Sequence, residues 1–444
     1  MQSINPVTEK VIQQYQAHNL MQITKYIAHL EAGFNIWRNT SFTGRSAVFI
    51  NIAKILEQNK QQYANLITLE MGKLNVSAIA EIDKCIWCCN YYAKNAAAML
   101  STQTIESNAD NSYISFEPLG IVLGIMPWNF PFWQAFRYIV PTLMAGNVTL
   151  LKHASNVSGC ALAIENIFNQ ANSNILKTIL FPGRDIAEVI MHSKIAAVTL
   201  TGSVSTGKSV AAAAGANIKK TVLELGGNDP YLILADANIK FAAKTCATSR
   251  LNNSGQVCIA AKRCIVVASV YENFLQELIS CFKNADALAP LASKQILEAV
   301  TKQVAASIQQ GATCVLGGKS LQQTGYFYPA TILTDIPLNS PAHSEEIFGP
   351  VAAVFKVQDT REAIALANDS EFGLGAAIFS KNLQQAQIIA REIQAGSVFI
   401  NSQVSSDPRL PFGGIKHSGY GRELADFGIK EFVNIKTIST SSPK

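Results

Sequence analysis

The segment Ile121-Val122-Leu123-Gly124-Ile125-Met126, followed by Pro127-Trp128-Asn129-Phe130-Pro131, decides the fold class. A short, continuously apolar run without polar alternation is typical of a strand buried on both faces of a sheet. The run ends abruptly in a polar turn framed by prolines. Ligands of open α/β sheets bind at the carboxyl ends of the strands, so Asn129 is a candidate site residue. A rigid turn that tolerates asparagine explains the same sequence equally well.

Similar runs occur on the C-terminal side of this segment, and stretches of helical character separate several of them. The runs cover residues 148–151, 196–200, 221–223, 231–234, 264–268, 352–357, 376–379 and 397–400. Residues 160–170 and 205–214 are the clearest of the intervening helical stretches. Short buried strands that alternate with helices predict βαβ units and parallel sheets. We therefore expect an α/β fold with two lobes, the second beginning near Leu223.

The first ~100 residues have the apolar periodicity of helices instead. Residues 113–116 alternate in polarity and predict a hairpin strand.

Composition excludes several classes of protein. Of 444 residues, 48% are hydrophobic and 15% charged, which rules out a disordered or coiled-coil chain. The net charge of +5 is too small and too dispersed to indicate nucleic-acid binding. No apolar run reaches the ~18–20 residues of a membrane helix, and the first residues lack the pattern of a secretory signal. These features predict a cytoplasmic enzyme that binds neither nucleic acid nor membrane.

The nine cysteines predict no disulfide framework, because their number is odd and no export signal precedes them. Cys85 and Cys88 have the spacing of half a zinc site, but no second pair completes it. We expect buried helix cysteines there and no metal. Cys258 differs because it follows the turn Asn253-Ser254-Gly255-Gln256-Val257. A cysteine on such a turn can be exposed and reactive, although a structural role is also compatible.

Other candidate residues follow the predicted strands. Lys152 and Ser155 come after the run at 148–151. An amino group and a hydroxyl at the end of a strand can bind phosphate or ribose; the alternative is that the lysine lies in solvent. Ser203 precedes a predicted helix, whose N-terminal N–H groups favour anions. Glu224 ends another run, and Glu346 lies before a Gly-Pro turn.

Together these segments resemble the aldehyde dehydrogenase superfamily. The motifs that carry the resemblance, in family order, are Pro127-Trp128-Asn129-Phe130-Pro131, Thr201-Gly202-Ser203, Glu224-Leu225-Gly226-Gly227, Gly255-Gln256-Val257-Cys258, Glu346-Ile347-Phe348-Gly349-Pro350 and Pro411-Phe412-Gly413-Gly414. They span nearly the whole chain. Within the superfamily, residues 255–263 and 407–414 are most similar to the succinate-semialdehyde dehydrogenases.

The resemblance implies a mechanism. Cys258 is expected to be the nucleophile that attacks an aldehyde, and Asn129 with the Cys258 backbone N–H to bind the resulting oxyanion. Hydride passes to the nicotinamide, and a thioester remains. Glu224 is expected to act as the general base that activates water.

The resemblance also implies the cofactor contacts. Lys152 is expected at the adenosine ribose, Ser203 at the pyrophosphate with Trp128 beside it, and Glu346 at the nicotinamide ribose with Phe348 beside it. NAD-preferring relatives usually carry Glu where this chain has Ser155, and that carboxylate repels a 2′-phosphate. We therefore expect NADP as cofactor, with NAD possible.

The expected substrate is succinate semialdehyde. Arg137 corresponds to an arginine that succinate-semialdehyde dehydrogenases use for the distal carboxylate, and an internally paired structural arginine is the alternative. A second arginine of some relatives is replaced by Asn252. Arg409 or the serines at 402, 405 and 406 are candidates to compensate.

The resemblance also implies that the chain has two domains and an arm, and that it forms an oligomer. Residues 1–103 and 120–222 are expected to form a Rossmann-type cofactor-binding domain, residues 223–415 an α/β catalytic domain, and residues 104–119 and 416–444 a small β oligomerisation arm. The arm predicts a homodimer or homotetramer. Oxidation of another small aldehyde, acyl transfer to phosphate or CoA, and a catalytically silent binding or structural protein of the same fold remain alternatives.

Overall fold

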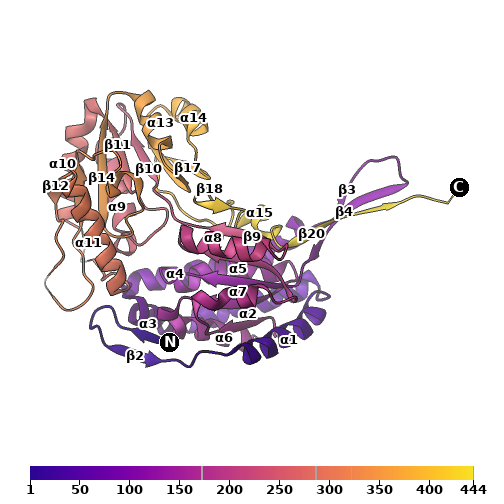
Figure 1. The fold of residues 1–444 in the computed structure, drawn as a ribbon. Coiled ribbons are helices and arrows are strands. Elements are labelled where there is room, and N and C mark those ends of the chain that lie inside the picture. Colours follow the sequence, from indigo (N-terminus) through magenta and orange to yellow (C-terminus); the bar gives the residue numbers. More distant parts are fainter. Residues whose placement is uncertain (172–173, 286–287, 322, 444) are drawn as a thin grey trace.

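Two α/β lobes and a projecting β arm make up the computed structural model (Figure 1). The structure describes residues 1–171, 174–285, 288–321 and 323–443. Across these residues, no helix is both long enough and apolar enough to span a membrane.

The first lobe is built on a six-stranded sheet whose strands are parallel except for one edge strand. Its order is β19 (Gly419–Tyr420), β9 (Lys220–Glu224), β8 (Ile195–Thr201), β5 (Ile121–Met126), β6 (Val148–His153) and β7 (Leu176–Ile179). All six residues of β5 are buried, as its unbroken apolar run predicts. The strand at 121–126 is therefore confirmed as a central strand of a parallel sheet.

Helices pack around this sheet and occupy most of the first 100 residues, as predicted. They are α1 (Leu20–Trp37), α2 (Phe42–Gln58), α3 (Lys60–Met71), α4 (Asn75–Met99), α5 (Pro131–Met144), α6 (Ser158–Gln170), α7 (Ile186–Ile190) and α8 (Val204–Gly215). Every residue of α5 is buried, so any polar side chain on this helix must find its partners inside the protein.

The second lobe contains a seven-stranded sheet that is parallel except for its first strand. Its order is β12 (Thr313–Leu316), β13 (Thr331–Thr334), β14 (Val351–Val357), β11 (Arg263–Val267), β10 (Pro230–Ile233), β16 (Gly375–Phe379) and β17 (Ser397–Ile400). Its helices are α9 (Ile239–Leu251), α10 (Tyr271–Lys283), α11 (Lys294–Gln309), α12 (Pro341–Ser344), α13 (Thr360–Asn368) and α14 (Leu383–Glu392).

The chain passes from the first sheet to the second between β9 and β10. Leu223, where the sequence places the start of the second lobe, still pairs with Leu200 of β8. The crossing therefore lies at residues 225–229, because β9 ends at Glu224 and β10 begins at Pro230. These residues include Gly226 and Gly227, and they bring both lobes to one place.

The projecting arm is a three-stranded antiparallel sheet of β20 (Val433–Thr440), β4 (Asn111–Pro118) and β3 (Gln103–Thr104) (Figure 1). The strand predicted at residues 113–116 is thus confirmed. Part of the segment 416–444 lies elsewhere: β19 pairs with β9, and α15 (Ala425–Ile429) packs against α5. The glycine-rich loop returns the chain to the first sheet before the arm begins.

Two pairs of short strands were not predicted, because their sequences carry no strong strand pattern. They are the hairpin of β1 (Gln2–Ile4) and β2 (Val11–Gln14) and the pair of β15 (Phe372–Gly373) and β18 (Ile415–Lys416). Cys85 and Cys88 are buried in α4, as expected for helix cysteines.

Candidate active site

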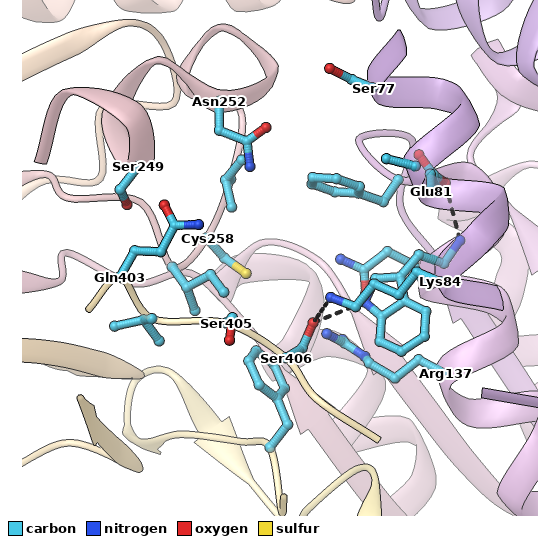
Figure 2. Close-up of a pocket in the computed structure, with 18 residues that line it drawn as sticks. Ser77, Glu81, Lys84, Arg137, Ser249, Asn252, Cys258, Gln403, Ser405 and Ser406 are labelled. Carbon is cyan, nitrogen blue, oxygen red and sulfur yellow. Dashed lines mark hydrogen bonds between the residues drawn. The ribbon is translucent and has the colours of Figure 1, made fainter. Parts of the chain in front are cut away.

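Two cavities meet at Cys258. One, of about 270 Å³, is lined by residues of α4, α5, the Cys258 loop and residues 403–406 (Figure 2); we call it the helix-side cavity. The other, of about 250 Å³, is lined by Trp128, Asn129, Ser203 and residues 225–226, among others; we call it the strand-end cavity. Cys258 and Gln134 line both cavities. The thiol is therefore accessible from two directions.

The backbone before Cys258 is held in an unusual conformation. Asn253, Ser254 and Gly255 have φ of 50°, 54° and 76°, in the left-handed region. The Arg250 guanidinium compensates by donating hydrogen bonds to the carbonyls of Gly255 (2.9 Å), Ile347 (3.1 Å) and Gly349. Arg250 thus fixes the loop against the segment that follows Glu346, and a strained turn held in this way is common at active sites.

The Cys258 thiol is partly exposed, and burial raises its pKa to about 12 although the Lys262 and Arg137 charges oppose this shift. At neutral pH the sulfur therefore carries its proton and needs a base to become a nucleophile. Among the nine cysteines, all described, no other lines either cavity. Cys258 is thus the cysteine that both cavities reach.

Asn129 reaches the strand-end cavity beside Cys258. Its Nδ2 donates to the Gln256 carbonyl at 2.9 Å, and the Asn253 side chain donates to the Asn129 carbonyl at 3.0 Å. An amide nitrogen has two N–H groups, so one remains for a ligand. Asn129 is therefore both a fixed part of the Cys258 loop and a hydrogen-bond donor.

Unlike Asn129, Glu224 does not reach the cavities beside Cys258. Its carboxylate is buried, lines neither cavity, and lies where a Cβ on Gly413 would touch it at 2.7 Å. Burial, together with the negative charge of Glu423, raises the pKa of Glu224 well above its usual value. Neither carboxylate oxygen has a hydrogen-bond partner in the described part of the chain. The structure therefore brings Asn129 to Cys258 but leaves the Glu224 carboxylate turned away.

The strand-end cavity also contains four of the predicted cofactor residues. The rings of Trp128 and Phe348 pack edge to face at 5.7 Å. Ser203 is the N-cap of α8, where its Oγ accepts from the Thr206 N–H at 3.3 Å. Glu346 Oε1 accepts from the Gly227 N–H at 3.1 Å. Two aromatic rings, a helix N-terminus and a carboxylate suit an aromatic ring attached to a phosphorylated ribose.

A third cavity, of about 440 Å³, lies beside α8 and contains Lys152 and Arg184. Lys152 ends β6 and is buried, which lowers the pKa of its ammonium group. Ser155 starts the 3-10 turn Ser155–Val157 and is exposed, outside the residues that line this cavity. Two cations near a helix N-terminus fit a phosphorylated adenosine, so the residues present suit a dinucleotide.

Arg137 lines the helix-side cavity but is largely engaged inside the protein. It forms an ion pair with Glu423, donates to Thr201 Oγ1 at 3.3 Å, and stacks over the Phe412 ring at 4.6 Å. The internally paired arginine that the sequence left as an alternative is therefore present in the structure, at the cavity wall.

Of the compensating candidates, Ser405 and Ser406 line the helix-side cavity, as does Asn252. Ser402 and Arg409 do not line it. Arg409 instead pairs with Asp407 at 2.7 Å.

Comparison with known protein families matches residues 1–438 to the aldehyde dehydrogenase family. The chain belongs to this family. A Synechocystis protein named "Probable succinate-semialdehyde dehydrogenase [NADP(+)]" is 47% identical over 98% of both chains. "Succinate-semialdehyde dehydrogenase [NADP(+)] 1" of Mycobacterium tuberculosis is 41% identical over 98% of both. The succinic semialdehyde dehydrogenase of Streptococcus pyogenes, solved in complex with NADP+, superposes with a TM-score of 0.97 and 36% identity, covering 99% of this chain and all of that one.

The predicted family, the α/β aldehyde dehydrogenase fold and the enzyme class are thereby confirmed. Sequence reasoning missed four residues of this aldehyde dehydrogenase site: Lys84, Arg250, Lys262 and Glu423. Lys262 donates to the Val257 carbonyl at 3.0 Å and pairs with Glu346 at 3.1 Å, so it connects the cysteine loop to the strand-end cavity. Its position four residues after Cys258, within residues 255–263, was an available signal.

Proposed function

We propose that this chain oxidises succinate semialdehyde to succinate with NADP as the hydride acceptor. The observation that carries the proposal is the position of Cys258 between two cavities, one lined by Lys84 and Arg137 and the other by aromatic rings and a helix N-terminus. A carboxylated aldehyde suits the first and a dinucleotide the second. The names of the similar proteins point to the same substrate and cofactor.

In the proposed reaction the Cys258 thiol releases its proton to solvent, and the sulfur bonds to the aldehyde carbon. The carbonyl oxygen becomes negative and accepts hydrogen bonds from Asn129 Nδ2 and the Cys258 backbone N–H. Each such donor contributes about 2.7–4 kcal/mol in comparable sites. The bound dinucleotide supplies the hydride acceptor, and loss of hydride leaves a thioester on Cys258.

Glu224 is the proposed base for hydrolysis of this thioester. Burial and the negative charge of Glu423 raise the pKa of Glu224, so its carboxylate is a stronger base than an exposed one. Because its carboxylate packs against Gly413, the side chain must rotate toward Cys258 before it can activate water. Water then replaces sulfur at the acyl carbon, and the proton removed from water reaches the leaving thiolate.

NADP is the proposed cofactor because this chain has Ser155 where NAD-preferring relatives usually carry a carboxylate that repels a 2′-phosphate, while Lys152 and Arg184 supply positive charge in the third cavity. Trp128, Ser203, Glu346 and Phe348 are proposed to hold the pyrophosphate and nicotinamide riboside parts.

The purified protein, tested with NADP or NAD and a panel of aldehydes at 340 nm, decides this proposal. We expect the highest kcat/KM with succinate semialdehyde and NADP. A higher kcat/KM with an uncharged aldehyde contradicts succinate semialdehyde as the substrate. A higher kcat/KM with NAD contradicts NADP as the cofactor. Absence of activity with every aldehyde favours a silent protein of this fold.

The arm is proposed to pair subunits in a homodimer or homotetramer, since β20 and β3 leave exposed edges. Light scattering coupled to gel filtration tests this, and a monomer contradicts it.

The proposed division places the cofactor and catalytic domains on either side of the crossing at residues 225–229. A cytoplasmic location is also proposed, because all nine cysteines are free thiols, as is usual in a reducing compartment. Cell fractionation tests it.

A further inference from the structure

The helix-side cavity contains a cation that the family motifs do not include. Ser77, Glu81 and Lys84 lie on one face of α4 and line the cavity together. Figure 2 shows Lys84 and Arg137 on the side of the cavity formed by the helices, with the Cys258 sulfur pointing into the same space from the other side. A ligand bonded to Cys258 therefore extends toward Lys84.

Lys84 is held in place by neutral groups. Its Nζ donates to Ser406 Oγ at 2.8 Å and lies 4.4 Å from the centre of the Trp133 ring. Trp133 Nε1 donates to the same Ser406 Oγ at 3.0 Å. An ammonium group has three N–H donors, so two remain after the bond to Ser406. Within the described part of the chain, no carboxylate forms an ion pair with Lys84.

The other charges at this wall are already compensated. Arg137 is paired with Glu423. Glu81 is paired with Lys73, and its Oε1 accepts from the backbone N–H groups of Phe132 (2.8 Å) and Trp133 (3.1 Å) at the start of α5. Lys84 therefore supplies the uncompensated positive charge among the described residues of this wall, and it can bind an anion without breaking an existing ion pair.

We propose that Lys84 is the principal residue that binds the distal carboxylate of the aldehyde substrate, with Arg137 in a secondary role. This inference rests on the proposed function, because it assumes a substrate with an acid group at the end opposite the aldehyde. Ser406 fixes the ammonium group and can turn its own hydroxyl proton toward the carboxylate. Arg137 uses Nε for Glu423 and one N–H of Nη2 for Thr201, so it can still donate to the carboxylate, but its charge is already compensated by the Glu423 ion pair.

The test compares Lys84→Gln with Lys84→Arg, which keeps the charge, and with Lys94→Gln, a change at an exposed position of the same helix. Each is assayed with NADP on succinate semialdehyde and on butanal, an uncharged aldehyde with four carbons. Loss of a hydrogen bond to a charged group predicts a rise of about 10–100-fold in KM for succinate semialdehyde in Lys84→Gln. We expect kcat and all butanal parameters to stay within about twofold, partial recovery in Lys84→Arg, and no change in Lys94→Gln.

A second measurement separates this inference from the proposed function. Succinate is tested as a competitive inhibitor of butanal oxidation, which reports carboxylate binding whether or not succinate semialdehyde is turned over. We expect Lys84→Gln to weaken this inhibition to a similar extent. Equal effects on both aldehydes, or unchanged succinate inhibition, overturn the role of Lys84. Poor oxidation of succinate semialdehyde by the unmodified protein, with succinate inhibition still dependent on Lys84, overturns the proposed substrate alone.

Discussion

The two cavities that meet at Cys258 use different means to bind a ligand. The strand-end cavity is lined by the rings of Trp128 and Phe348 and by residues at the ends of strands. The helix-side cavity is also lined by aromatic rings, among them those of Trp133 and Phe412, but it adds ammonium, guanidinium and hydroxyl groups from helices and a loop. The strand-end cavity therefore suits a large ligand of fixed structure, such as a dinucleotide. The helix-side cavity is suited to distinguish small molecules by their charge. If the two cavities act separately, a substitution in one leaves the selectivity of the other unchanged.

The largest effect is expected at the residue that both cavities share. Cys258→Ala removes the nucleophile, so aldehyde oxidation should fall by at least about 10³-fold, as in other enzymes that lose a covalent nucleophile. The measurement is the pre-steady-state and steady-state appearance of reduced cofactor. Cys281→Ala, a partly exposed cysteine outside both cavities, is the matched control and should retain activity. Substantial turnover by Cys258→Ala would contradict the proposed mechanism.

Asn129 belongs to the strand-end cavity but is proposed to act on the substrate. Asn129→Asp keeps the size of the side chain and removes the N–H donors, so kcat should fall by about 10²–10³-fold. Because Asn129 also holds the Gln256 carbonyl, the melting temperature is measured in parallel. A fall in activity that tracks a fall in melting temperature would indicate a structural role instead.

Glu224→Gln separates the two halves of the reaction. Hydrolysis should slow by about 10²-fold or more, the usual contribution of a general base, while thioester formation is less affected. The expected trace is a burst of reduced cofactor followed by a slow steady state. Equal loss of burst and steady state would show that Glu224 acts earlier than proposed.

Ser155 tests whether cofactor choice can be changed without affecting substrate choice. Ser155→Glu places a carboxylate near the proposed 2′-phosphate position and should shift the ratio of kcat/KM for NADP to NAD by about 10–100-fold toward NAD. Ser155→Ala removes the hydroxyl without adding charge and serves as the comparison. If both variants shift the ratio equally, lost hydrogen bonding and not repulsion explains the preference.

The smallest effect is a dependence on pH that involves the helix-side cavity alone. Burial, with a smaller contribution from Arg137, lowers the pKa of Lys84 to about 8, while Cys85, Cys88 and Asp407 oppose this shift. The positive charge is therefore present below pH 8 and is lost as the pH rises through that value. The ratio of kcat/KM for succinate semialdehyde to that for butanal should fall by up to about tenfold between pH 7 and pH 9. A constant ratio would contradict this titration.

Much of the strand-end cavity could be predicted from the sequence, whereas in the helix-side cavity the sequence indicated Arg137, Ser405 and Ser406 but not Lys84. Asn129 and Ser203, which line this strand-end cavity, follow two buried strands within three residues, and the sheet brings them to one edge; Glu224 ends a neighbouring strand at the same edge but does not line the cavity. Lys84 lies in the middle of a helix and reaches the site only because α4 packs on α5. Ser406 belongs to a loop more than 300 residues later in the chain. Nothing in the local sequence indicates this contact, since packing between distant segments creates it.

The orientation of the Glu224 side chain was also beyond sequence analysis. A motif identifies a carboxylate at the end of β9, but the direction of the side chain depends on Gly413, which comes from the returning glycine-rich loop.

Cys258 comes from a loop of the second lobe, and Asn129 comes from the end of a strand in the first. Activity therefore reports on the docking of the two lobes and not on the integrity of either one alone. In a denaturant titration, catalysis should disappear as soon as the lobes separate, even where each sheet still gives its far-ultraviolet circular dichroism. Two separately expressed halves that refold together should regain activity only on forming a complex.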